Sequence, residues 1–217
     1  MELLKFELFS KCSTFRVPLS IKGIETYPLP PYSTIIGLLY TAIGRKWEGE
    51  KFSISVQGNY DSIFRDYLGL KKYNRDKKKK KLETLPLQIP RLYNLRCIVH
   101  ISSEDRGLLE EFKKGLESPE VYLFLSGGEY PVLVKNVKIL RGNFKYAEGE
   151  TRYSIYVPEE KKNLIWERWG IHLRIPRFCK RVKGERECEW VDVYYFSKGA
   201  YYEGEILIDE EGTPVWL

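Results

Sequence analysis

Alternation of apolar and polar side chains is the clearest pattern in the first half of the chain. Residues 2–9 alternate with a period of two, which predicts a strand that buries one face. The same period recurs at residues 51–57 and 95–101, and in the last segment Arg96 and His100 occupy the polar face. We therefore expect three half-buried strands in the first hundred residues.

A first helix is expected directly after the proline-rich residues 27–31. Apolar side chains then continue to Gly44, which can end the helix, and Ser33 is the expected N-cap. Gly37 inside this helix costs about 1 kcal/mol relative to alanine. We take that cost to indicate a close approach to another element, so Gly37→Leu is expected to disrupt how the helix packs.

A second helix is expected between the third strand and Pro119. Ser102 or Ser103 is the expected N-cap, with Asp105 completing a capping box. The apolar stripe of this helix comprises Leu108, Leu109, Phe112 and Leu116.

Two further strands are expected at residues 121–125 and 132–139, with a turn at Gly127 and Gly128 between them. These elements over about residues 1–140 include the order β-α-β-β-α-β, which predicts an α+β fold of the ferredoxin-like (RRM-like) type. The aromatic and Lys/Arg-Gly pattern by which RRM domains stack bases is missing from the third strand. The fold by itself assigns no function.

The remainder, residues 141–217, is expected to form a small β-rich subdomain. Extended segments are predicted at residues 152–157, 190–196 and 202–208, and a turn at residues 209–212.

The charge of the chain is divided unevenly. The chain has 217 residues and a net charge of +6, yet residues 65–96 hold 11 basic and 3 acidic residues, and residues 168–186 hold 7 basic and 1 acidic. Two basic patches on an acidic body are typical of proteins that bind a polyanion, most often nucleic acid. The alternative is a pair of lysine-rich, solvated loops.

Several classes of protein are excluded by the same sequence. No apolar run reaches the length of a membrane span, and the first residues lack the pattern of a secretion signal, so we expect a cytoplasmic protein without a membrane partner. The four cysteines form no CxxC pair, and His172, Cys179 and Cys188 match no standard zinc spacing. We expect unpaired thiols in a reducing compartment, and no metal or other cofactor.

Two motifs resemble those of the Cas-five family of CRISPR-associated RAMP proteins. The first is YPLPPYSTIIGLL at residues 27–39, which resembles the family's P-P-S-T-x-x-G-(L/M)-L segment with Tyr32 inserted. The second is LFLSGGEYP at residues 123–131, which resembles the family's glycine-containing turn before E-Y. The order of the motifs on a ferredoxin-like frame, and a basic insertion at about residues 61–94, agree with that family.

The resemblance implies an RNA-binding subunit of a type I Cascade complex for antiviral defence. Members of the family cap the 5′ handle of the CRISPR RNA (crRNA) and contact the backbone and large subunits of the complex. The basic insertion resembles their thumb hairpin, which folds over the RNA.

Single-stranded RNA is held by cations on phosphates and by aromatic or arginine planes on bases. In the insertion, Arg91 and Arg96 are the expected specific contacts, because guanidinium groups bind phosphate in a bidentate manner. The other expected RNA-binding residues in the insertion are Lys71, Lys72, Arg75, Lys77, Lys78, Lys79, Lys80 and Lys81. Outside the insertion they are Arg16, Lys22, Tyr32, Gly127, Gly128, Arg177, Lys180 and Arg181, of which the last three face either RNA or an acidic partner subunit.

Catalysis is not expected, because no compact constellation for metal-free RNA cleavage emerges from the spacing. The alternative is a metal-independent endoribonuclease that processes precursor crRNA, with His172 as the first candidate because basic residues surround it. His100 lies among apolar neighbours and is interpreted as structural. A more remote alternative is a ferredoxin-like interaction module that does not bind RNA.

Overall fold

The computed structural model describes residues 1–18, 20, 24–73, 82–166 and 169–217. Its two α-helices are α1 (Tyr32–Ala42) and α2 (Arg106–Glu117), and a 3₁₀ helix, η1, spans Glu159–Leu164. The strands in the described residues are β1 (Glu2–Ser13), β2 (Ser53–Asn59), β3 (Ser62–Tyr73), β4 (Leu82–Ser102), β5 (Val132–Glu150), β6 (Ser154–Pro158), β7 (Ile171–Val182), β8 (Glu185–Phe196), β9 (Tyr201–Asp209) and β10 (Pro214–Val215).

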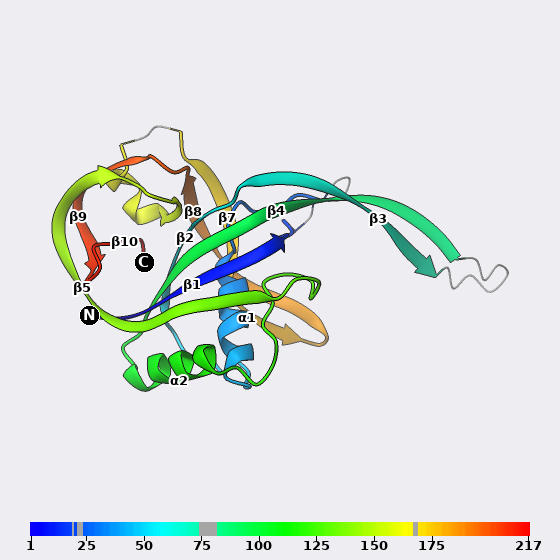
Figure 1. Cartoon of the computed structure of the whole chain (residues 1–217), viewed down its shortest axis with the longest axis horizontal. Helices are drawn as coiled ribbons and strands as arrows, with labels where there is room; N and C mark the ends of the chain where they lie inside the picture. Colours follow the sequence, from blue (N-terminus) through cyan, green and yellow to red (C-terminus); the bar gives the residue numbers. More distant parts are fainter. Residues whose placement is uncertain (19, 21–23, 74–81, 167–168) are drawn as a thin grey trace.

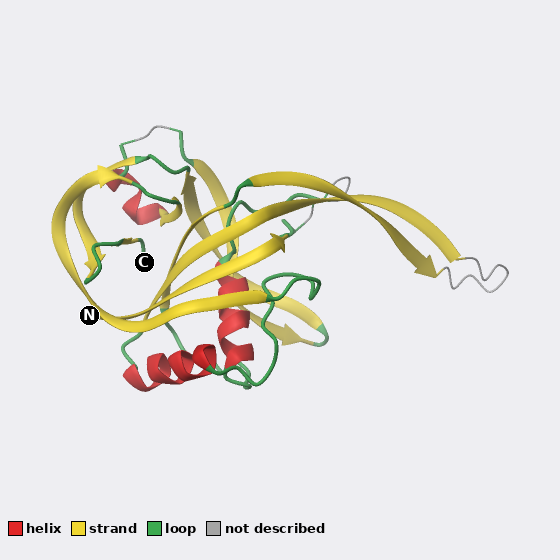
Figure 2. Ribbon diagram, in the orientation of Figure 1, coloured by secondary structure: helices red, strands yellow, loops and turns green. Residues whose placement is uncertain are grey.

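The molecule is built on one mostly antiparallel sheet with few helices, an α+β architecture rich in strand (Figure 2). The strands follow the order β10-β9-β5-β1-β4-β2-β6-β8-β7, and β3 pairs with β4 outside this path. The centre of the sheet, β5-β1-β4-β2, is formed by the segments that the alternation predicted. The two helices lie together on one side of it (Figure 1).

The main core lies between the sheet and the helices. Phe6 and Leu8 of β1 are buried in the same cluster as α1 and as the predicted stripe of α2. Because side chains alternate along a strand, their neighbours in β1 point to the opposite face of the sheet. That opposite face is called the outer face below.

The C-terminal segment covers one end of the outer face. Lys5 of β1 and His100 of β4 are paired in register there, and both contact Asp209 at the end of β9. Lys5 Nζ lies 2.7 Å from Asp209 Oδ2, and His100 Nε2 lies 3.0 Å from the same oxygen. Burial alone would raise the pKa of Asp209, but hydrogen bonds from His100 and Lys5 outweigh it and lower the pKa. His100 is fully buried, in agreement with a structural role.

The predicted helix caps differ from those in the structure. Helix α1 begins at Tyr32 after Pro31, without a side-chain cap, and Ser33 is buried in its first turn. Helix α2 is capped by Asp105, whose carboxylate accepts a hydrogen bond from the Leu108 N–H at 3.3 Å. The prediction of a serine N-cap was therefore wrong for both helices. In α1 the serine is buried by tertiary packing, and in α2 the carboxylate of Asp105 is the stronger hydrogen-bond acceptor.

Strand assignments were least accurate in the second half of the chain. Residues 121–125 do not form a strand, and only an isolated bridge joins Phe124 to Pro131. β5 runs for 19 residues, far past residue 139, because it pairs first with β1 and then with β9. β7 was missed, since its pattern is broken by a register shift between Pro176 and Cys179.

The expectation for Gly37 was also wrong. Gly37 is exposed, and a Cβ atom placed there would meet nothing within 4 Å. The close approach between the two helices occurs instead at Gly115 of α2, where a Cβ would lie 2.6 Å from Ile43 Cγ2 and 2.9 Å from the Ala42 carbonyl oxygen.

Two of the four cysteines are paired, contrary to the expectation of free thiols. Cys179 and Cys188 face each other across β7 and β8 with their Cα atoms 4.0 Å apart, and they form a disulfide. Cys12 and Cys97 are free and buried. The pairing depends on the hairpin register, which the nine-residue separation in sequence does not reveal.

Candidate nucleic-acid interface

The most extended feature of the molecule is the hairpin of β3 and β4. The strands pair in register from Ser62 and Tyr93 at its base to Tyr73 and Leu82, and the hairpin projects away from the body (Figure 1). β4 continues from the hairpin directly into the centre of the sheet, which fixes the direction of the projection.

The described residues of the hairpin, from Ser62 to Tyr73 and from Leu82 to Tyr93, lie within the segment predicted as a basic insertion, residues 61–94. Lys71 is exposed on β3, and the backbone of Lys72 pairs with that of Glu83. Arg75 and the lysines at 77–81 lie outside the described residues.

Arg91 fixes the base of the hairpin. Its side chain is 7% exposed and forms ion pairs with Asp66 of β3 at 2.7 Å and with Glu129 of the loop before β5 at 2.6 Å. Burial disfavours the charge, but the hydrogen bonds to Glu129 and Asp66 outweigh it and raise the pKa of Arg91. The guanidinium group thus links the hairpin to the glycine turn, and its N–H donors are bound by the carboxylates of Asp66 and Glu129.

Cations and aromatic rings alternate on the open part of the outer face, beside the base of the hairpin. Lys11 Nζ lies 4.4 Å from the centroid of the Tyr93 ring and donates to its hydroxyl at 2.7 Å. The Arg96 guanidinium lies 5.9 Å from the centroid of the Phe9 ring, and its side chain is 59% exposed. Phe64, 40% exposed, meets Tyr93 edge to face. Sequence analysis found Arg96 but missed Phe9 and Lys11.

Asp61 orients this surface from the start of the hairpin. Its carboxylate accepts from Asn94 Nδ2 at 2.7 Å and from Arg96 Nη1 at 3.1 Å. The hydrogen bond from Asn94, and then that from Arg96, lower the pKa of Asp61. A shallow hollow of about 260 Å³ adjoins Arg96 and is also lined by Leu133 and Lys135 of β5.

The glycine turn lies open to solvent next to the base of the hairpin. A Cβ atom at Gly127 or Gly128 would meet nothing within 4 Å, and Gly128 has a φ of +78°. The turn is tied to the first strand region by a hydrogen bond from Thr14 N to Ser126 Oγ. The expected backbone approach to phosphate is therefore sterically open at both glycines.

Other predicted RNA-binding residues lie elsewhere. Arg16 is exposed at an isolated bridge to Thr26, and Lys22 lies outside the described residues. Tyr32 is 5% exposed, its hydroxyl has no hydrogen-bond partner among the described residues, and burial raises its pKa. It belongs to the core.

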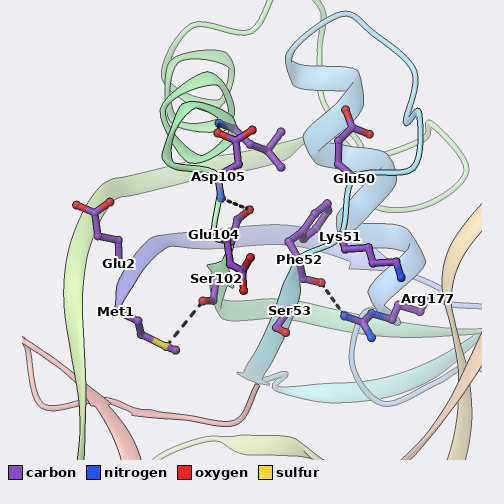
Figure 3. A pocket seen from close by; sticks show the side chains of 12 residues that line it. Met1, Glu2, Glu50, Lys51, Phe52, Ser53, Ser102, Glu104, Asp105 and Arg177 are labelled. Atoms are coloured by element: carbon purple, nitrogen blue, oxygen red, sulfur yellow. Dashed lines mark hydrogen bonds between the residues drawn. The ribbon is translucent and has the colours of Figure 1, made fainter.

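Arg177 borders a pocket of about 870 Å³ on the helical side (Figure 3). Its Nη2 donates to the Phe52 carbonyl oxygen at 2.6 Å. The same pocket is lined by the carboxylates of Glu2, Glu50, Glu104 and Asp105. Lys51 is the other basic side chain in the lining, so acidic residues outnumber basic ones around Arg177. Lys180 and Arg181 lie on the β7–β8 hairpin beside α1, away from Arg96.

His172 is part of a small polar cluster on β7 and β8. Its Nε2 lies 3.3 Å from Asp192 Oδ1, and its ring centroid lies 5.1 Å from that of Tyr194. Lys162 Nζ lies 4.1 Å from the centre of the same tyrosine ring. The structure therefore brings together a histidine, a tyrosine and a lysine that the sequence did not connect.

No cluster of three or more His, Cys, Asp or Glu side chains suited to a metal ion occurs in the described residues. Among those residues there is likewise no helix with the length and hydropathy needed to cross a membrane.

Known structures of low sequence identity share this fold. A chain from a structure described as a CRISPR RNA-guided surveillance complex aligns with a TM-score of 0.59 and 9% identity, over 92% of this chain and 91% of that one. A CRISPR protein from Archaeoglobus fulgidus aligns with a TM-score of 0.54 and 14% identity, over 99% and 98% of the two chains. A third structure, described as a Cas protein, has a TM-score of 0.50 and 16% identity over 98% of each chain.

No curated protein matches the chain by sequence. A family model does match, over residues 3–197, and its description is CRISPR-associated protein (Cas_Cas5). That range includes both motifs, both helices and the long hairpin. The chain therefore belongs to the Cas_Cas5 family of CRISPR-associated proteins.

Proposed function

We propose that this protein is the crRNA-binding subunit of a type I, Cascade-type complex, and that it caps the 5′ handle of the RNA. In this proposal residues 1–140 form the ferredoxin-like RAMP domain, the β3–β4 hairpin is its thumb, and residues 141–217 form the C-terminal part. Membership of the Cas_Cas5 family and the fold shared with a chain from a surveillance complex support the assignment.

The observation that carries the proposal is the cation–aromatic surface at the base of the hairpin. Lys11 with Tyr93, and Arg96 with Phe9, offer positive charge and ring faces side by side on the uncovered part of the sheet. Phosphates of a single strand are attracted to such cations, and unstacked bases lie on such rings. The open glycine turn and the projecting hairpin border this surface and provide room for an RNA strand.

The test is RNA binding by surface variants of the full chain. We expect the double variant Lys11→Ala/Arg96→Ala to bind a labelled 5′-handle RNA more weakly than wild type. The slope of log K against log salt should fall by about 0.7 for each phosphate that the variant no longer neutralises. Arg141→Ala/Lys145→Ala is the control, because it removes the same charge from exposed positions of β5. Equal affinities and slopes for the two double variants would refute the proposed surface.

Partners and location follow from the same proposal. We propose that the protein acts in the cytoplasm with crRNA and with the backbone and large subunits of the complex. The exposed aromatic side chains Tyr122 and Tyr130, next to the glycine turn, are suitable for contact with another subunit.

A metal-independent endoribonuclease is the second candidate, and the His172 cluster favours it. Metal-free RNA cleavage needs a base, an acid and a cation near the phosphate. His172, Tyr194 and Lys162 are groups of these kinds, and His172 and Lys162 each lie close to the Tyr194 ring. Incubation of precursor crRNA with the protein in EDTA tests this activity. A single cut that His172→Ala abolishes would establish the endoribonuclease activity. Intact RNA that shifts on a native gel would mean that the protein binds RNA without cleaving it.

A further inference from the structure

A groove between α1 and the β7–β8 hairpin is separate from the proposed RNA surface. It measures about 830 Å³. Its floor is the face of α1 that carries Ile36, Gly37 and Tyr40, and its walls are the segment after α1 and the end of the hairpin near Cys179. The groove borders α1, which packs with α2 against the face of the sheet opposite the outer face, and the outer face carries Arg96. Figure 1 shows the two helices on one side of the sheet.

The groove is strongly basic. Arg45, Lys46, Lys180, Arg181 and Arg186 line it, and no Asp or Glu side chain in the described part of the chain does so. Arg45 is neutralised by ion pairs with Glu50 and with Glu111. The other four cations have no carboxylate oxygen within 4.0 Å among the described residues.

Two of these cations oppose each other directly. Arg181 and Arg186 are cross-strand partners, two residues along from the disulfide pair Cys179 and Cys188. Like charges at directly opposed positions of a sheet are destabilising. The disulfide holds the two strands together at this point, so the paired positive charge is retained next to the groove. A negatively charged group bound between the arginines would relieve the repulsion.

Gly37 keeps the floor of the groove open. In the middle of a helix, glycine is about 1 kcal/mol less favourable than alanine. No neighbour requires glycine here, because a Cβ atom would meet nothing within 4 Å. The packing of the protein therefore does not explain the residue. The absence of a side chain at Gly37 leaves space along the helix for a ligand bound in the groove.

The lining favours a protein segment over RNA. Tyr40 is 5% exposed, and one face of the Trp47 ring is covered by Phe178, whose centroid lies 5.0 Å away at an interplanar angle of 13°. The groove thus offers only the half-buried Trp47 ring, whereas Phe9, Phe64 and Tyr93 lie together beside the base of the long hairpin. An apolar floor bordered by cations is complementary to an acidic segment that presents apolar side chains at helical spacing.

We propose that this groove binds an acidic, amphipathic segment of a partner protein. Apolar side chains of the segment lie over the open position at Gly37, and its carboxylates pair with Arg181 and Arg186. The sequence left open whether Lys180 and Arg181 face RNA or an acidic partner; the groove favours the partner. This inference does not depend on RNA binding at the other face.

The experiment measures fluorescence anisotropy of three labelled probes with the full chain. The first probe is a 15-residue peptide of glutamates with leucines three and four residues apart. The second has the leucines replaced by glutamine at the same charge, and the third is a 12-nucleotide oligouridine. We expect the first peptide to bind, and the second to bind at least tenfold more weakly.

Two variants separate the contributions of charge and space. Arg181→Gln/Arg186→Gln and Gly37→Leu should each weaken binding of the first peptide at least tenfold, with melting temperatures no lower than that of wild type. Arg141→Gln/Lys145→Gln is the matched charge control and should bind as wild type does. Gly37→Ala adds one methyl group to the floor of the groove and should weaken binding less than Gly37→Leu does.

Three results would overturn the proposal. The first is that the leucine-containing peptide does not bind. The second is that both peptides bind equally, or that Gly37→Leu has no effect, because either finding would mean that charge attraction alone accounts for binding. The third is loss of oligouridine binding in Arg181→Gln/Arg186→Gln but not in Lys11→Ala/Arg96→Ala, which would make the groove a nucleic-acid site.

Discussion

Single residues in this protein take their roles from what surrounds them, and the helix glycines illustrate this. Gly37 and Gly115 both lie inside α-helices, where alanine has the higher intrinsic propensity. Only Gly115 lies against another helix, and an added Cβ there would overlap Ile43 and the Ala42 carbonyl group.

The two glycines should therefore respond to alanine in opposite directions. Gly37→Ala is expected to raise the free energy of unfolding by about 1 kcal/mol, which is roughly 2–4 °C in melting temperature for a chain of this size. Gly115→Ala is expected to lower it by about 1–3 kcal/mol, because overpacking outweighs the gain in propensity. Thermal unfolding of the two variants checks this. A stabilised Gly115→Ala would contradict the close helix contact.

Protonation of His100 should influence stability near neutral pH. Burial lowers the pKa of His100, although Asp209 accepts a hydrogen bond from the ring. Between that lowered pKa and the value of about 6.5 in the unfolded chain, the unfolded state binds more protons. The stability that neutral His100 contributes is complete above about pH 6.5 and is lost as the pH falls through the folded-state pKa.

Denaturant unfolding at pH 5.0, 6.0 and 7.5 checks this dependence. The free energy of unfolding of wild type should decrease as the pH falls, and His100→Gln should show a smaller decrease. His172→Gln is the control, because that histidine is half-exposed on β7. An identical pH dependence in wild type and His100→Gln would mean that the pKa of His100 is the same in the folded and unfolded states.

At the level of elements, turns and strand registers determined most of the structural features that the sequence patterns did not predict. The stripe of α2 and the strands β1, β2 and the second half of β4 follow from simple periodicity. β7 and the long β5 do not, because a bulge breaks the first and a change of pairing partner extends the second. The disulfide between Cys179 and Cys188 follows from the same hairpin register.

Removal of the disulfide should loosen the end of the β7–β8 hairpin. In the chain-entropy model, closing a loop of this length contributes up to about 2.5 kcal/mol. We expect the Cys179→Ser/Cys188→Ser variant to exchange its amide hydrogens faster over residues 178–189. Exchange in the β1–β4 pair should be unchanged and serves as the internal control. Equal protection of the hairpin with and without the disulfide would contradict this prediction.

At the level of the whole molecule, the distribution of charge separates two surfaces. The sequence already divides the chain into an acidic body with two basic stretches. The described residues of the first stretch belong to the projecting hairpin and its base, near the cation–aromatic surface, whereas Lys180, Arg181 and Arg186 of the second stretch line the groove beside α1. Steering of RNA by the first stretch is expected to depend on salt.

Replacement of Lys77, Lys78, Lys79, Lys80 and Lys81 by alanine tests that dependence. We expect weaker RNA binding and a smaller slope of log K against log salt, because fewer counterions are released from the phosphates. Binding measured between 50 and 300 mM salt gives the slope. An unchanged slope would mean that these lysines do not contribute to RNA binding.

The sequence by itself determined the α+β class, the order of the first strands and helices, the division of charge and, through two motifs, the family. These properties reside in local periodicity and in short segments, so they can be read along the chain. Only the tertiary structure decided which side chains meet. Arg91 became an ion-paired brace, Tyr32 a core residue, and Phe9 and Lys11 part of the candidate interface. Strand register and sheet curvature fix such contacts, and they arise from pairings between residues far apart in sequence.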